Sequence, residues 1–203
     1  MAAILTSLRN TVLAGFALAI VLLIVVGLVT GGYGLNFAGK SFWLFVVRWL
    51  HVLSGILWIG LLYYFNFVQI PNMPKIPDEQ KPAVSKVIAP AALFWFRWAA
   101  MSTITFGILL ALLQEYFVNA VLLGITSKVP NHTMIGIGMW LGSIMWFNVW
   151  FVIWPNQKVA LGLVEGTADQ KKAAARKAML FSRTNTMLSV PMLYAMIATQ
   201  TAY

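Results

Sequence analysis

The feature that most constrains this chain is a set of long apolar segments, each long enough to cross a lipid bilayer as a helix. A hydrocarbon core about 30 Å thick requires about 20 residues of helix, because each residue adds about 1.5 Å along the axis. Five segments meet this length, at about residues 11–30, 43–68, 90–113, 134–154 and 180–201. The sequence therefore predicts an all-α integral membrane protein, a bundle of about five transmembrane helices forming one domain over residues 1–203.

The composition agrees with a membrane protein and excludes several kinds of site. Of the 203 residues, 61% are hydrophobic and 9% are charged, whereas soluble domains are about a quarter charged. The chain has no cysteine, which excludes disulfides, iron–sulfur clusters and covalently attached c-type haem. The formal net charge of +9 indicates membrane orientation first. Without basic patches interleaved with aromatic residues, we expect no nucleic-acid partner.

Lysines and arginines outside the apolar segments predict the orientation, since positive loop residues favour the cytoplasmic side. Two of them, Lys40 and Lys128, lie on one side of the membrane. Nine lie on the side of the N-terminus: Arg9, Lys75, Lys81, Lys86, Lys158, Lys171, Lys172, Arg176 and Lys177. We expect the N-terminus inside and the C-terminus, at Tyr203, outside. Residues 116–123 either prolong the third helix or lie at the membrane interface.

The second apolar segment carries two ionisable residues, Arg48 and His51, at a spacing that puts them on one helix face. An ionisable residue inside a membrane segment is by default a functional-site hypothesis. Ser54 and Gly55 follow His51 by one turn and are small, so the imidazole has room beside it for a flat ligand or a close helix. Trp58 closes that face one turn further on.

This arrangement suits haem b. His51 is expected about 12 Å into the outer half of the membrane, on the same side as the turn that bears His132. A neutral imidazole is a usual axial haem ligand, and propionates need cationic partners near water. We therefore expect His51 to bind haem b, His132 or a methionine to supply the second ligand, and Arg48 and Lys40 to pair with the propionates.

Two other interpretations of the histidines stay open. His51 could form only a hydrogen bond between helices. Copper is a further, less favoured cofactor, because Met134 and Met139 are close in sequence to His132.

A second polar group is expected at the inner side of the membrane. Arg97 lies within the third segment, and no carboxylate lies inside any apolar segment to neutralise it. The group that four segments send to this level comprises Asn66, Gln69, Arg97, Asn148, Asn156, Gln157, Arg183 and Asn185. Two arginines without carboxylates favour an anion site, with Arg97 and Arg183 as its charges. The alternative is that the arginines reach back to lipid headgroups.

Four stretches of the chain resemble the membrane domain of bacterial membrane-bound urate hydroxylases, the urate oxidase N-terminal type. They are RWLHVLSGILWIGLLYYFNFVQIP, ALFWFRWAAMSTITFG, NVWFVIWPNQKVALG and RTNTMLSVPMLYAMI. The histidine-bearing segment is also similar, more loosely, to small haem-binding membrane protoporphyrinogen oxidases. Both resemblances imply membrane redox chemistry, and the first implies that the arginine-lined group suits the urate anion. Longer members of that family carry a C-terminal cytochrome c domain, whereas this chain has no CxxCH motif.

These observations together predict a haem-b-binding redox protein of urate-hydroxylase type in the bacterial inner membrane. We expect it to pass electrons to a cytochrome c or a neighbouring membrane subunit on the outer face, as part of an oligomer or complex, and leave open whether it is itself an oxidoreductase. The alternative is a non-catalytic transmembrane subunit of a larger enzyme. The GxxxG pair of Gly138 and Gly142 would then offer a small-residue face for docking, although the commoner role of this motif is close helix packing.

Overall fold

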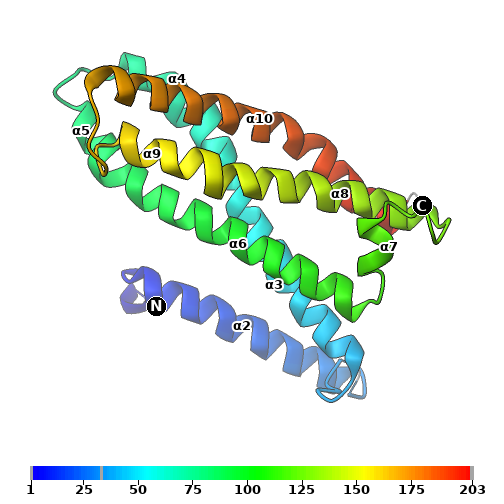
Figure 1. The fold of residues 1–203 in the computed structure, drawn as a ribbon. Helices are drawn as coiled ribbons and strands as arrows, with labels where there is room; N and C mark the ends of the chain where they lie inside the picture. Colours follow the sequence, from blue (N-terminus) through cyan, green and yellow to red (C-terminus); the bar gives the residue numbers. More distant parts are fainter. Residues whose placement is uncertain (1, 33, 202–203) are drawn as a thin grey trace. The chain divides into compact units, whose positions relative to one another are not determined.

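The computed structural model describes residues 2–32 and 34–201, and all regular structure in these residues is helical (Figure 1). The chain divides into two compact units, Met1–Val46 and Val47–Tyr203. Within residues 2–32 and 34–201, four helical segments are long and apolar enough to cross a membrane: Leu8–Val29, Lys40–Lys75, Lys81–Leu113 and Pro130–Ala160. The prediction of an all-α protein with membrane-spanning helices is therefore confirmed.

The first unit consists mainly of one apolar helix. It contains α1 (Ala2–Leu5) and α2 (Leu8–Val29), and the side chain of Ser7 caps α2 by accepting a hydrogen bond from the backbone N–H of Asn10. The chain leaves α2 through glycines with positive φ, at 71° for Gly31 and 88° for Gly32. Such angles favour glycine because it has no Cβ, which is why the glycine-rich stretch ends this helix.

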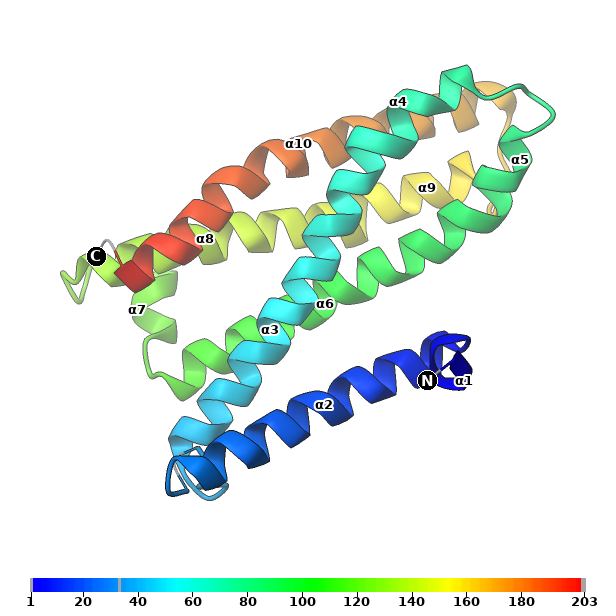
Figure 2. The same ribbon diagram turned by 180° about the vertical axis from the view of Figure 1, so that it is seen from behind.

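The second unit contains the long helices that carry the candidate site residues (Figures 1 and 2). The first helical path consists of α3 (Lys40–Tyr63), which begins in the first unit, followed by η1 (Tyr64–Gln69), α4 (Ile70–Asn72) and η2 (Met73–Lys75). A short connection leads to the second path, which consists of α5 (Lys81–Ala83), η3 (Val84–Ile88) and α6 (Ala89–Leu113). The remaining elements are α7 (Phe117–Val121), α8 (Pro130–Phe147) with η4 (Asn148–Ile153) and α9 (Trp154–Ala160), and α10 (Ala168–Thr201).

The long helices of the second unit run between two ends. We call the end at which α4, α5, α9 and the first turns of α10 gather the α9 end, and the end that carries α7 and the start of α8 the α7 end (Figures 1 and 2). Between them, Trp58, Leu62, Phe96, Met145 and Val149 are buried together in the core. The predicted orientation puts the α9 end inside; it stays a prediction, and Tyr203 lies outside the described residues.

Each of the three π-helical segments is followed by a proline at the same distance. Pro71, Pro90 and Pro155 lie two residues after the last residue of η1, η3 and η4. A proline in a helix lacks the N–H, and its ring clashes with the carbonyl four residues earlier. That carbonyl falls inside the π-helical segment in all three cases, where the wider turn gives the ring room.

The helices consequently continue through two prolines that the sequence suggested as their ends. The apolar segments expected at 43–68 and 134–154 stop before Pro71 and Pro155, yet the helical path runs to Lys75 and to Ala160. Those expectations were wrong because the π-helical turns remove the steric reason for stopping. Residues 116–123 do not prolong α6. A turn with φ of 65° at Glu115 separates α6 from the short helix α7.

The last helix begins with a cap formed by two side chains, twelve residues before the apolar segment expected at 180–201. The backbone N–H of Thr167 donates to Gln170 Oε1 at 2.8 Å, and the N–H of Gln170 donates to Thr167 Oγ1 at 3.3 Å, which is a reciprocal capping box. From there α10 runs to Thr201 through Pro191 and packs along α8 and α9 (Figures 1 and 2). It is not among the four segments apolar enough to span, so the count of five spans stays a prediction.

The glycines of α8 are used for packing inside the unit. A Cβ on Gly138 would lie 3.2 Å from Met196 of α10, and one on Gly142 would lie 4.0 Å from Ile104 of α6. Both glycines are buried, so they do not form the exposed docking face considered above. A Cβ on Gly136 would meet the backbone oxygen of Ala120 in α7.

We predict that Gly136→Ala destabilises the protein, because the backbone of α7 must move to admit the methyl group. Overpacking costs about 1–3 kcal/mol, which lowers the thermal midpoint by several degrees. Gly60→Ala is the matched control, since Gly60 is exposed in a helix and a Cβ there has no neighbour within 4 Å. Both changes gain the same helix propensity. Equal midpoints for the two variants in detergent would contradict the close contact of α7 with α8.

Candidate functional site

A buried arginine on α6 lies against a tryptophan of α9 near the α9 end. The guanidinium carbon of Arg97 is 3.4 Å from the centroid of the Trp154 ring, a close cation–π contact. Arg97 is only 9% exposed, and its Nη1 atom is buried without a hydrogen-bond partner among the described residues. A buried charge is normally paired or fully hydrogen-bonded. The unpaired Nη1 is therefore a donor available to a ligand.

An unpaired acceptor accompanies this donor on α9. Gln157 follows Trp154 by three residues and so shares its helix face, and its Oε1 atom is buried without a partner in the described part of the chain. Lys158 adds a second cation, with Nζ 5.7 Å from the Trp154 ring. Asn156 instead donates to the carbonyl of Val152 at 2.7 Å, so its amide group is used within its own helix.

A layer of buried amides joins α10 to the neighbouring helices. Asn148 donates to Asn185 Oδ1 at 2.8 Å, and Asn185 donates to the carbonyl of Met145 at 2.9 Å. On the same face of α10, Ser182 Oγ accepts a hydrogen bond from Asn66 Nδ2 at 2.8 Å. The Oδ1 atom of Asn66 is buried and has no partner among the described residues, and the same is true of Gln69 Oε1. These unpaired acceptors lie on η1, toward the same end of the unit as Arg97.

The structure separates the two arginines that the sequence suggested as one anion site. Arg183 is exposed, whereas Ser182, Asn185 and Ser189 of the same helix are buried. Those three residues define the inner face of α10, and at 100° per residue Arg183 points away from it. Arg183 therefore lies on the exposed face of α10, and its share in a site with Arg97 stays a prediction that no described contact supports. The spacing of Ser182, Asn185 and Ser189 carried this signal, and the sequence analysis did not use it.

The imidazole of His51 is held by α6. Its Nδ1 atom lies 2.9 Å from the carbonyl oxygen of Thr103, and a carbonyl can only accept. Nδ1 therefore carries the proton, and in the neutral ring Nε2 keeps its lone pair. A Cβ on Gly107 would lie 3.0 Å from His51 Cε1, so this glycine makes room for the ring. The space that the sequence left beside His51 is thus partly taken by a close helix.

His132 has different partners at the α7 end. Its Nδ1 atom is 2.8 Å from Ser127 Oγ, and its ring stacks on Tyr116 with the centroids 6.3 Å apart. Burial raises the pKa of the Tyr116 hydroxyl, and the positive charge of Arg48 acts in the opposite direction. The structure thus brings Arg48 and His132 to one tyrosine that the sequence analysis did not select. No described contact joins His132 to His51.

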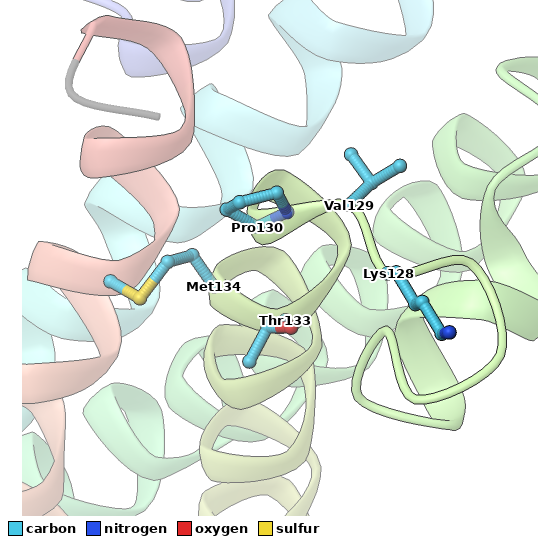
Figure 3. Close-up of a pocket in the computed structure, with 5 residues that line it drawn as sticks. All are labelled: Lys128, Val129, Pro130, Thr133 and Met134. Carbon is cyan, nitrogen blue, oxygen red and sulfur yellow. The ribbon is translucent and has the colours of Figure 1, made fainter.

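For the remaining predicted residue, Lys40, the structure describes no contact with His51. Lys40 begins α3 in the first unit, so its pairing with a propionate at His51 stays a prediction. A shallow pocket at the start of α8 is lined by Lys128, Val129, Pro130, Thr133 and Met134 (Figure 3). No group of three or more His, Cys, Asp or Glu side chains suited to a metal occurs among the described residues.

His51 fits haem ligation by its donor chemistry. The hydrogen bond from Nδ1–H to a backbone carbonyl leaves Nε2 as the metal-binding atom, which is the usual arrangement of a ligating histidine. No described hydrogen bond occupies Nε2. The contacts of His132 are with Ser127 and Tyr116, so its role as the second ligand stays a prediction.

Comparison with known proteins gives one family. The model of the urate oxidase N-terminal family matches residues 128–203, which is less than half of the chain. No curated protein and no solved structure matches. The matched segment runs from the turn before α8 through α10 and includes Asn148, Gln157 and Asn185, but neither Arg97 nor His51. The resemblance suggested by the WPNQK and RTNT motifs is therefore confirmed over residues 128–203, where the chain is similar to the urate oxidase N-terminal family.

Proposed function

We propose that this protein is a membrane redox protein of urate-hydroxylase type that binds a urate-like anion beside Arg97 and haem b at His51. The observation that carries the proposal is the buried guanidinium of Arg97, whose Nη1 has no acceptor and which no described carboxylate neutralises. An anion would satisfy both requirements through a charge-assisted hydrogen bond. The resemblance of residues 128–203 to the urate oxidase N-terminal family supports urate as the anion to test.

The residues around Arg97 favour a flat ligand with both donors and acceptors. Trp154 holds the guanidinium by its face, which orients the N–H edge of Arg97 away from the ring. Gln157 Oε1, one turn along the same face, would accept from an N–H of the ligand. Urate has carbonyl oxygens and ring N–H groups and can complete both bonds. A planar quinone-like molecule would complete only the first.

Haem b would be held by His51 through Nε2, with Arg48, one helical turn nearer the α7 end, as the cationic partner of a propionate. When bound, the haem supplies one-electron transfer. The protein's own contribution is to fix the imidazole: Thr103 orients the ring through Nδ1, and Gly107 leaves room for it. His51 and the electron exit would then lie toward the α7 end, where the exposed Lys128 would face an acidic or haem-bearing partner such as cytochrome c.

The second candidate is a non-catalytic subunit of a larger membrane enzyme. Exposed aromatic residues on α6 favour it: Phe94, Trp95 and Trp98 are each about half exposed, and Trp98 contacts Trp150 of η4 edge to face. Such rings suit a helix–helix contact with another subunit or the membrane interface. The visible spectrum and the binding of urate distinguish this candidate from the first.

We predict that Arg97→Gln weakens urate binding by about tenfold or more, because a charge-assisted hydrogen bond contributes roughly 1.5–3 kcal/mol. Arg183→Gln is the matched control: it removes the same charge from an exposed position and should leave urate affinity unchanged. Equilibrium dialysis with labelled urate on detergent-solubilised protein measures both. Equal losses in the two variants, or no urate binding by the wild type, would contradict an anion site at Arg97.

We predict that His51→Ala removes the Soret absorption while the protein still inserts into the membrane, since insertion depends on the apolar helices. His132→Ala, on a different set of partners, should have a smaller effect. Absorption spectra of protein purified from haem-replete cells, normalised to protein concentration, give the comparison. A normal spectrum in His51→Ala would show that the ligand is another residue, and a colourless wild type would rule out haem.

The proposed electron exit requires the α7 end to face outward. A periplasmic reporter enzyme fused after the last residue, beyond the described end of α10, should be active, because α10 ends near the start of α8 (Figures 1 and 2). The same reporter fused before α2 should be inactive. Activity of the C-terminal fusion only with a cytoplasmic reporter would rule out transfer to an outer-side cytochrome c from this end.

A further inference from the structure

One face of α10 points away from the rest of its unit and repeats with a heptad spacing. Its residues alternate four and three apart and are all exposed: Arg176, Leu180, Arg183, Met187, Val190, Tyr194 and Ile197. We call this set the outer seam. Lys172, four residues before Arg176, is also exposed and extends it. The buried Ser182, Asn185 and Ser189 lie on the other side of the helix and fix which face is outward.

The side chains of the outer seam change from basic to apolar along the helix. Its first part is basic, with Lys172, Arg176 and Arg183, and everything after Arg183 is apolar or aromatic. Neither Arg176 nor Arg183 has a carboxylate partner among the described residues. The seam itself contains no acidic side chain. The charges of Arg176 and Arg183 are therefore not neutralised by a described carboxylate, and they precede the apolar part of the outer seam, which begins at Met187.

The neighbouring helices place this change from basic to apolar beside the second half of a membrane-spanning segment. Asn185 bonds to Asn148, where α8 passes into η4, and Met196 packs on Gly138 of α8. The apolar part of the outer seam thus runs beside a membrane-spanning segment. From Arg183 to Tyr194 the helix rises about 16 Å, which is about one leaflet of a hydrocarbon core roughly 30 Å thick. Arg183 then lies toward the α9 end of the segment, from which a long arginine side chain reaches back to the headgroups, and Arg176 lies about 10 Å further along the helix.

We propose that the outer seam binds an anionic phospholipid. The phosphate is held by Arg183 and Arg176, which are seven residues, or about 10 Å of rise, apart on one face. Guanidinium groups bind phosphate through paired N–H donors. One acyl chain lies along Met187, Val190 and Tyr194. A second copy of α10 in parallel does not fit this seam, because it would set Arg183 against Arg183 with no acid to neutralise them.

The test compares lipid binding by charge-matched variants of the same helix. The wild type should bind phosphatidylglycerol at least about tenfold more tightly than phosphatidylcholine, as measured by native mass spectrometry of protein released from detergent with each lipid added. Arg176→Gln with Arg183→Gln should abolish this preference. The control pair Lys171→Gln with Lys177→Gln removes two charges from exposed positions outside the outer seam and should keep the preference.

Several outcomes would overturn the proposal. Equal loss in the control pair would mean that the basic region acts only through total charge. The absence of a preference in the wild type would remove the site. Full displacement of the lipid by excess inorganic phosphate would show a free-anion site without an acyl contribution. Photocrosslinking from position 187 to another polypeptide in place of lipid would assign the outer seam to a protein partner. Unchanged thermal midpoints, expected because both arginines are exposed, confirm that the variants fold.

Discussion

The two hydrogen bonds of Asn185 determine how the C-terminal helix presents its faces. This side chain is fully buried and bonds to Asn148 and to the carbonyl of Met145. Leaving such an amide unpaired in an apolar interior is costly, so the rotation of α10 about its axis is fixed. The same rotation sends Ser182 and Ser189 inward to Asn66 and Tyr63. It sends Arg183 outward, away from the buried Arg97.

Proline and helix geometry together shape the α9 end. Each π-helical segment contains the carbonyl four residues before a proline, which is the carbonyl that the proline ring would contact in an α-helix. Because a π turn holds an extra residue, it also shifts the face on which later side chains lie. Asn66 and Asn148 both lie within such turns. The prolines that looked like helix ends are therefore part of what directs polar side chains toward α10.

Unpaired polar atoms toward this end support the proposed anion site. Arg97, Gln157, Gln69 and Asn66 each keep a buried polar atom without a partner in the described chain. A folded protein has few such groups, because each one costs free energy. A ligand that satisfies them recovers that cost on binding, which is the physical reason to place the anion here and not at the exposed Arg183.

The sequence by itself determined the helical membrane class, the capping box that begins α10, and the resemblance to the urate oxidase N-terminal family. These follow from local rules: the length of an apolar run, the spacing of Thr167 and Gln170, and short motifs. Only the tertiary structure decided which residues face each other. The spacing of Ser182, Asn185 and Ser189 marks one polar face of α10, but a polar face by itself does not tell whether it packs on neighbouring helices or faces outward. Packing against α8 and η4 separates Asn185 from Arg183, since only one face of α10 brings Asn185 to Asn148.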